Sequence, residues 1–254
     1  MDRGAWGWPT FAVPWCVFVA DHRGPVHEEA LPCLKVEPKR SDLLRFLGYP
    51  HAAQTLRHLP ELMEQALERG QVCLATAGVY ALYDVGGRTD QSLTLGGVVI
   101  TGRVGEFLRS ARQVAVFVVT AGADISKMAQ RLAANGDTVT AWALDALGSW
   151  AAEAAADALM ARLAAHLGTN EVLSLRYSPG YCGMDLDEQA ALFRLVRAED
   201  IGVALQPSSR LMMPLKSISG LVGLERPLRD LAGNGPSRSP CVRCGDLGCP
   251  VRRR

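Results

Sequence analysis

The segment that begins at Arg176 and ends at Cys182 reads Arg-Tyr-Ser-Pro-Gly-Tyr-Cys and combines side chains suited to holding a small molecule. The guanidinium of Arg176 can donate two parallel hydrogen bonds to one carboxylate. Pro179 fixes one φ angle, while Gly180 allows the backbone to approach a ligand closely or to adopt a positive φ. Tyr181 adds a ring face that attracts cations. The alternative is a strand that ends in an ordinary Pro-Gly turn, with Arg176 paired on the surface.

Two later segments, Met212-Met213-Pro214 and Ser217-Ile218-Ser219-Gly220, follow this one in a fixed order. Together the three segments resemble the reactivation domain of cobalamin-dependent methionine synthase. They resemble more closely the stand-alone proteins related to that domain, where Arg-x-x-x-Gly-Tyr is the S-adenosylmethionine-binding signature. The resemblance covers residues 40–254. It implies S-adenosylmethionine binding by Arg176, Ser178, Gly180, Tyr181, Met213, Ser217, Ser219 and Asp145.

An Ala-rich pattern over residues 137–167 predicts one long helix, because alanine has the highest helix propensity. Polar residues recur at every fourth position of this helix and therefore share one face. These residues are Asp145, Ser149, Glu153 and Asp157. The simpler interpretation is a solvated stripe. The resemblance offers another, because this helix is similar to the one that precedes the binding motif in the family, so that Asp145 or Glu153 would face the ligand.

A cysteine cluster near the C-terminus contains Cys241, Cys244 and Cys249. Three thiolates with a fourth ligand suit tetrahedral zinc or an iron–sulfur cluster. Cys182 is the predicted fourth ligand, because in relatives whose motif reads Gly-Tyr-Cys-Gly a C-terminal cysteine cluster accompanies that motif. Such a metal would hold the tail against the binding segment. The alternative is a tail of free thiols.

The pattern of the remaining elements predicts the fold class. Further helices are predicted for residues 42–47, 60–69, 105–113, 124–134 and 187–197. Strands are predicted for residues 72–85, 92–101, 114–120, 201–205 and 217–224, with a turn at the Gly86-Gly87 pair. This irregular order indicates a mixed α+β domain with a largely antiparallel, twisted sheet and flanking helices. The resemblance implies the same fold, that of a methionine synthase activation domain.

Length and composition set the outer limits. The 254 residues, 48% of them hydrophobic, can form a large core. A formal net charge of +1 favours neither nucleic acid nor a membrane surface as a partner, and no stretch reaches the roughly 18 apolar residues of a membrane helix. Seven cysteines, an odd number, favour a reducing compartment, so a cytoplasmic protein is expected.

Three parts are expected along the chain. Residues 1–39 form an N-terminal extension, residues 40–235 the activation-like domain, and residues 236–254 a cysteine-rich tail packed on the domain. Within the domain, residues 40–113 are expected to be a region of helices and strands, and residues 114–235 the ligand-binding region.

The resemblance also implies a function. The protein would bind S-adenosylmethionine and support reductive methylation of the cobalamin that a corrinoid-dependent methyltransferase, above all methionine synthase, presents to it. A reductase or another electron donor would supply the electron. Such a protein is an activation component of the methyltransferase class, and whether it is itself an enzyme stays open.

Two alternatives from other classes also stay open. One is a module that senses S-adenosylmethionine without methyl transfer, and the other is a zinc or iron–sulfur structural or redox subunit. A nucleotide-binding methyltransferase of the Rossmann type is disfavoured, because no Gly-rich loop follows the strand predicted for residues 114–120. The C-x-x-C-x-x-x-x-C spacing also differs from the C-x-x-x-C-x-x-C of radical S-adenosylmethionine enzymes.

Overall fold

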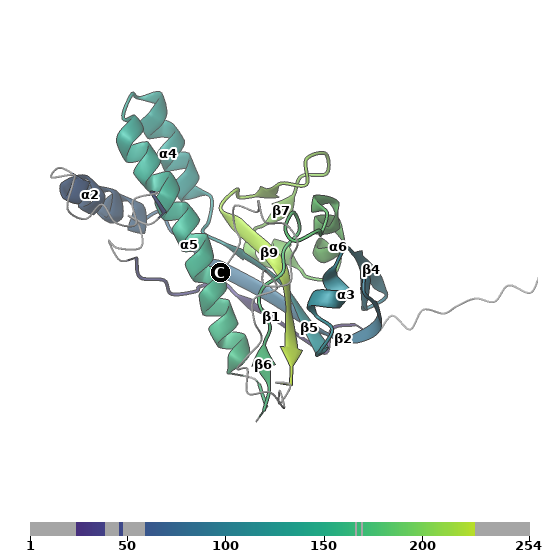
Figure 1. Cartoon of the computed structure of the whole chain (residues 1–254). Helices are drawn as coiled ribbons and strands as arrows, with labels where there is room; N and C mark the ends of the chain where they lie inside the picture. The colour runs from purple at the N-terminus through teal and green to yellow at the C-terminus, as the bar shows by residue number, and fades with distance from the viewer. Residues whose placement is uncertain (1–23, 39–45, 48–58, 166, 169, 227–254) are drawn as a thin grey trace, which may run out of the picture.

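The computed structural model describes residues 24–38, 46–47, 59–165, 167–168 and 170–226. Its main sheet contains β1 (His27–Leu31), β2 (Ala77–Thr89), β3 (Ser92–Leu95), β4 (Val98–Thr101), β5 (Ala111–Thr120), β6 (Val172–Leu173) and β9 (Ser217–Glu225). The strand order is β4-β3-β2-β5-β9-β6, with β1 also paired to β2. All the strand pairs of the described residues are antiparallel. The predicted mixed α+β class is therefore confirmed (Figure 1).

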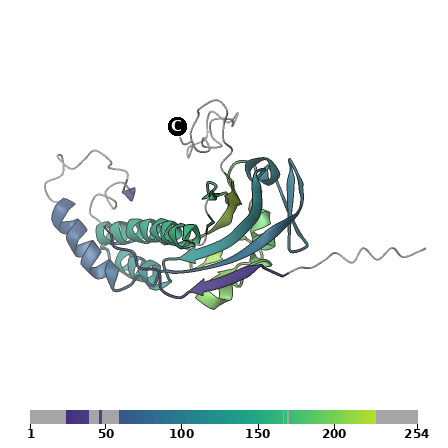
Figure 2. The same ribbon diagram turned by 90° about the horizontal axis from the view of Figure 1, so that it is seen from below.

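Strand β5 is apolar from Val114 to Val119, where both faces of the sheet are covered. Residues 115, 117 and 119 pack with α5 (Thr138–Ala164) in one buried cluster. Residues 114, 116 and 118 belong to the cluster that contains Leu192 of α6 (Gln189–Phe193). Successive side chains of a strand point to opposite faces, so each cluster lies on its own side of the sheet. Seen from below, the sheet is a curved layer (Figure 2).

Helix α5 is the longest element and serves two purposes. Its N-terminal half packs against α4 (Asp124–Ala134) and α2 (Leu59–Gln71), which lie beyond the edge of the sheet (Figure 1). Its C-terminal half covers the sheet through Ala155, Ala156 and Leu159. The Asp137 side chain caps the helix by accepting a hydrogen bond from the backbone N–H of Thr140. The helices predicted for residues 60–69, 124–134 and 137–167 are confirmed.

The predicted turn at the Gly86-Gly87 pair is wrong. Strand β2 continues through it to Thr89, with a shift of register between Val85 and Gly87. Glycine is common at such bulges because it has no side chain to pack. The chain reverses instead at Asp90 and Gln91, between β2 and β3. It reverses again at Gly96 and Gly97, which both have positive φ and divide the predicted strand 92–101 into β3 and β4.

Several other predicted elements are shorter in the structure. The helix expected over residues 105–113 is limited to α3 (Val104–Phe107), because pairing with β9 draws the chain into β5 from Ala111. The helix expected over 187–197 is a 3-10 turn (Leu186–Glu188) followed by α6, and the strand expected over 201–205 is limited to β7 (Ala204–Leu205). Strand β7 pairs with β8 (Met212–Met213). The strand over 217–224 is confirmed as β9, whereas most of the helix predicted over 42–47 lies outside the described residues.

The sheet begins before residue 40, inside the segment expected as an extension. Strand β1 pairs with β2 so that Glu29 lies opposite Tyr80. The Glu29 carboxylate accepts hydrogen bonds from the Tyr80 hydroxyl and from Arg162 of α5, both at 2.9 Å. These contacts join β1, β2 and α5 on one face of the sheet.

Alkaline unfolding should report on the Tyr80 contact. Burial, first, and then the hydrogen bond to Glu29 raise the pKa of Tyr80 to about 12. A raised folded pKa stabilises the protein fully below the unfolded value of 10.0, and this contribution is lost as pH rises through the folded value. We expect Tyr80→Phe to lower the free energy of unfolding by about 1 kcal/mol at neutral pH. Above pH 10, the free energy of unfolding of this variant should decline less steeply than that of the wild type. Urea unfolding across this pH range tests the expectation, and identical alkaline slopes would contradict it.

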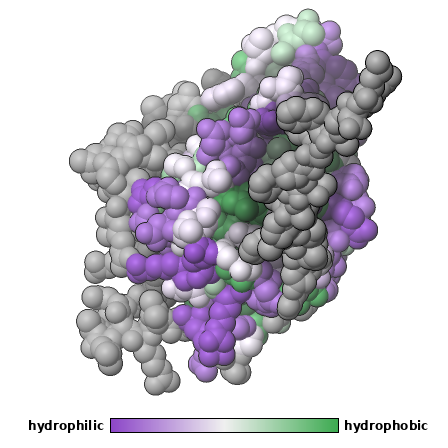
Figure 3. All heavy atoms as spheres, turned by 90° about the vertical axis from the view of Figure 1, so that its right-hand side faces the viewer, coloured by the Kyte–Doolittle hydropathy of each residue, from purple (hydrophilic) through white to green (hydrophobic). Residues whose placement is uncertain are grey.

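The surface of the described part is mainly polar on the side that carries α3, α6 and β4. Figure 3 shows this face as mostly hydrophilic, with a small apolar area near its centre. Within the described ranges, none of the helices has the length and apolar character needed to cross a bilayer.

Candidate ligand-binding site

Arg176 lies at the edge of the sheet and points toward α5. After β6 the chain continues antiparallel to β9 as far as the Tyr177–Leu221 bridge. The Nη2 atom of Arg176 lies 3.0 Å from Oε2 of Glu153 and 3.2 Å from Oδ1 of Asp157. Its Nη1 atom is buried and has no hydrogen-bond partner among the described residues. As placed, one terminal nitrogen of Arg176 is therefore held by α5, and the other is a buried donor without a partner among the described residues.

A tight turn over residues 178–184 follows Arg176. Three backbone hydrogen bonds hold it: from Tyr181 to Ser178, from Met184 to Tyr181, and from Gly180 to Met184. Gly180 has a φ of 83°, the left-handed conformation that glycine adopts without strain. Among the described residues, only Leu186 comes within 4 Å of the position of a Cβ on Gly180, at 3.9 Å. The described part of the chain therefore leaves the space in front of Gly180 open.

One tyrosine precedes this turn and is buried, and a second tyrosine lies within the turn and is exposed. Tyr177 is buried, its hydroxyl donates to the carbonyl oxygen of Cys182 at 3.0 Å, and its ring lies 4.9 Å from that of Phe107. Burial raises the pKa of Tyr177 well above its usual value, so the phenol stays neutral and anchors the turn. Tyr181 is 51% exposed. Tyr177 is not among the predicted site residues, although alternation along a strand places its side chain opposite that of Arg176.

The start of β9 forms the neighbouring part of the site. A Cβ on Gly220 would lie 2.8 Å from both Oγ of Ser178 and the carbonyl oxygen of Tyr177, so only glycine allows this close approach. Ser219 is buried in the same strand. The Ser217 hydroxyl lies 2.9 Å from Oγ1 of Thr120 and 2.7 Å from the carbonyl oxygen of Pro214. Two of the predicted segments therefore meet, while the Ser217 hydroxyl is engaged by neighbouring backbone and side-chain oxygens.

Two segments, residues 181–187 and residues 210–215, expose apolar side chains. An ion pair between Arg210 and Asp187 joins the two segments, with Nε and Oδ1 3.0 Å apart. We call the exposed apolar residues of these segments the apolar rim: Tyr181, Leu186, Leu211, Met213 and Leu215. Met213, a predicted site residue, is 42% exposed and belongs to this rim.

The polar stripe on α5 is more than a solvated face. Asp145 lies 2.8 Å from Nζ of Lys216, and the hydroxyl of Ser149 lies 2.8 Å from the same atom. Glu153 and Asp157 hold Arg176. Two cations from the segments beside α5 therefore bind successive turns of this stripe. Lys216 is not among the predicted site residues, and its only signal in the sequence is the four-residue spacing of potential partners on α5.

The predicted metal site cannot be assembled from the described residues. Cys182 lies in the 178–184 turn, partly buried, with a φ of 52°. Cys241, Cys244 and Cys249 lie outside the described residues. Among the residues that the structure does describe, there is no cluster of three or more His, Cys, Asp or Glu side chains that could bind a metal.

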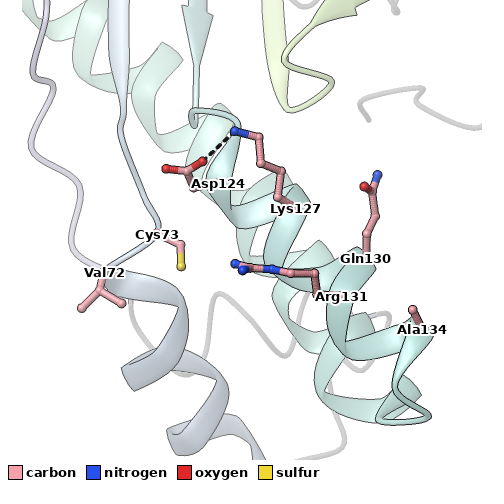
Figure 4. A pocket seen from close by; sticks show the side chains of 7 residues that line it. All are labelled: Val72, Cys73, Asp124, Lys127, Gln130, Arg131 and Ala134. Atoms are coloured by element: carbon pink, nitrogen blue, oxygen red, sulfur yellow. Dashed lines mark hydrogen bonds and ion pairs between the residues drawn. The ribbon is translucent and has the colours of Figure 1, made fainter.

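A separate hollow lies between the end of α2 and α4 (Figure 4). Its lining consists of Val72, Cys73, Asp124, Lys127, Gln130, Arg131 and Ala134. Lys127 and Asp124 pair with each other at 3.0 Å, and the Cys73 thiol donates to the carbonyl oxygen of Arg69. None of the predicted site residues lines this hollow.

Comparison with known proteins agrees with the geometry. Residues 106–227 match the family described as vitamin B12 dependent methionine synthase, activation domain. This range runs from α3 to just beyond β9 and includes the α5 stripe and the 178–184 turn. No curated protein matches the chain.

A solved structure shows the same fold. It is the crystal structure of the MetH reactivation domain bound to AdoHcy, with a TM-score of 0.61 and 18% sequence identity. The likeness covers 80% of this chain and 79% of that chain. Residues 106–227 are thus similar to the vitamin B12-dependent methionine synthase activation domain, and the chain shares the fold of the solved reactivation domain.

Proposed function

We propose that this protein binds S-adenosylmethionine beside Arg176 and the 178–184 turn. The observation that carries the proposal is the buried Nη1 of Arg176, which lacks a partner among the described residues. Gly180, four residues further along the chain, has a positive φ and few described atoms around its Cβ position. A buried donor without a partner costs about 1–3 kcal/mol, and an acceptor atom of a ligand would remove that cost. The family match and the AdoHcy bound in the similar structure support this choice of ligand.

The charges around Arg176 suit the mixed charges of this ligand. S-adenosylmethionine carries a carboxylate, which Nη1 of Arg176 can bind, and two cationic groups, an ammonium and a sulfonium. The α5 stripe has three carboxylates, from Asp145, Glu153 and Asp157, and their cationic partners within the described ranges are Arg176 and Lys216. The excess of negative charge attracts the cationic groups. The exposed ring of Tyr181 can stack on the base or contact the sulfonium.

The biological role we propose is reductive methylation of the cobalamin of a corrinoid-dependent methyltransferase, with methionine synthase as the first candidate. When bound, S-adenosylmethionine supplies the methyl group, and a separate reductase or electron donor supplies the electron. The chain itself binds and orients the methyl donor. The apolar rim supports this role, because exposed apolar surface commonly marks a docking site.

The first test is calorimetric titration of S-adenosylmethionine into the full chain. We expect saturable binding to one site per chain. A well-folded protein that releases or absorbs no heat over a wide range of ligand concentration would refute the proposal. For the biological role, transfer of a labelled methyl group to reduced cobalamin on methionine synthase should require this protein. Binding without transfer would identify a sensing module.

The metal site stays a prediction. Cys182 and the three C-terminal cysteines would bind zinc or an iron–sulfur cluster and hold the tail against the 178–184 turn. Metal analysis of the purified chain, compared with a Cys182→Ser variant, tests this assignment.

A further inference from the structure

Lys216 connects the segment between β8 and β9 to the middle of α5. Its Nζ atom lies 2.8 Å from Oδ1 of Asp145 and 2.8 Å from Oγ of Ser149, and the side chain is only 17% exposed. Its carbonyl oxygen accepts a hydrogen bond from the backbone N–H of Ala121 at 2.8 Å. The main chain of Lys216 is thus held at the end of β5, and its ammonium is held by the helix.

A glycine in α5 makes room for this lysine. A Cβ on Gly148 would lie 3.1 Å from Cγ of Lys216 and 3.2 Å from Cγ2 of Ile125, which is tighter than ordinary contact. Glycine is unfavourable inside a helix relative to alanine, and the surrounding sequence of α5 is rich in alanine. Gly148 therefore lowers the helix propensity of α5 at the position where the aliphatic part of the Lys216 side chain packs against the helix.

The residues just before Lys216 are only partly buried. Met213 is 42% exposed and Leu215 is 52% exposed, whereas Met212 packs against the core and pairs with Leu205 of β7. The contact of Lys216 with Asp145 and Ser149 ties these residues to α5. Arg176 binds the next turns of the same stripe through Glu153 and Asp157. Because Lys216 and Arg176 both bind α5, the position of the apolar rim relative to α5 also sets its position relative to Arg176.

We propose that Lys216 is a positioning residue. By pairing with Asp145 and Ser149 over Gly148, it fixes residues 211–215 relative to α5. It thereby sets the affinity of the Arg176 site without touching the ligand. This last step rests on the proposed function, whereas the fixing of residues 211–215 does not.

The test compares the full chain with Lys216→Met, which keeps a stem of similar length and removes the ammonium. In hydrogen exchange, we expect the amides of residues 211–217 to exchange about tenfold faster, as loss of a charged hydrogen bond predicts. The affinity for S-adenosylmethionine should fall by a similar factor. Lys216→Arg should restore part of both. Lys127→Met is the matched control, because its ammonium pairs with Asp124 on the exposed side of α4 and should change neither property.

A double-mutant cycle separates positioning from general stabilisation. Ser149→Ala removes the other partner of the Lys216 ammonium at a residue that is not a predicted ligand contact. It should reproduce part of the effects of Lys216→Met, and the combined variant should lose no more than Lys216→Met alone. Ser149→Ala also provides a second variant if Lys216→Met folds poorly. Unchanged exchange over residues 211–217 in both variants would overturn the proposal, as would a lower melting temperature with unchanged affinity. If the wild-type chain fails to bind S-adenosylmethionine while exchange still rises locally, the proposed function falls and the fixing of residues 211–215 by Lys216 stands.

Discussion

Replacing Arg176 with alanine is expected to weaken S-adenosylmethionine binding by about 100-fold, because a charge-assisted hydrogen bond is worth about 1.5–3 kcal/mol. The lost group is the buried Nη1 atom that has no partner among the described residues. Glu153 and Asp157 would lose their cation, but their side chains are 48% and 75% exposed, so water can solvate them. The loss of folding stability should therefore be small, about 1 kcal/mol or less. Calorimetric titration of both proteins, each checked by circular dichroism, measures the effect.

Arg162 supplies the matched control for this variant. It also belongs to an ion pair of α5, with Glu29 at 2.9 Å, but it projects toward β1 and not toward the 178–184 turn. Arg162→Ala should leave the affinity for S-adenosylmethionine unchanged within about twofold, the scatter expected for a distant site. Arg176→Lys should recover only part of the binding, because an ammonium lacks the planar geometry of a guanidinium. Equal affinities of Arg176→Ala and the wild type would place the ligand elsewhere.

Replacing Gly105 with alanine is expected to destabilise the fold by more than about 4 kcal/mol, an effect large enough to prevent folding. Gly105 lies in α3, which packs against the turn between β2 and β3. A Cβ at this position would lie 1.6 Å from the carbonyl oxygen of Thr89 and 2.7 Å from that of Ser92. Both obstacles are backbone atoms, so no change of side-chain rotamer relieves them. The helix or the turn would have to move.

Gly86→Ala is the control for this substitution. Gly86 lies in β2 near the same turn, and the nearest atom to its added Cβ is the carbonyl oxygen of Thr94 at 3.6 Å, an ordinary contact. We expect its free energy of unfolding to change by less than about 1 kcal/mol. Urea unfolding of both variants measures the difference. A loss below about 1 kcal/mol for Gly105→Ala would show that α3 can shift away from the turn at little cost.

Local patterns in the sequence determined the elements whose own residues specify them. The continuous apolar run of β5 and the alanine-rich run of α5 each predicted the observed element, because propensity and hydrophobicity act over neighbouring residues. The mixed, antiparallel fold class followed from their order. The positive φ of Gly180 also agrees with the expectation, since glycine tolerates it without strain.

Where two local sequence patterns predicted the same feature equally well, only the tertiary structure decided between them. Two Gly-Gly pairs could each form a turn, and strand pairing placed the turn at Gly96 and Gly97 while it made a bulge at the other pair. The partners of Arg176 and Lys216 lie far away along the chain, the nearest being Asp157, 19 residues before Arg176. The polar residues at every fourth position of α5 could equally face solvent or pair with cationic side chains. The packing of α5 beside β9 decided this question, because charged side chains pair with whatever the fold brings within a few ångströms.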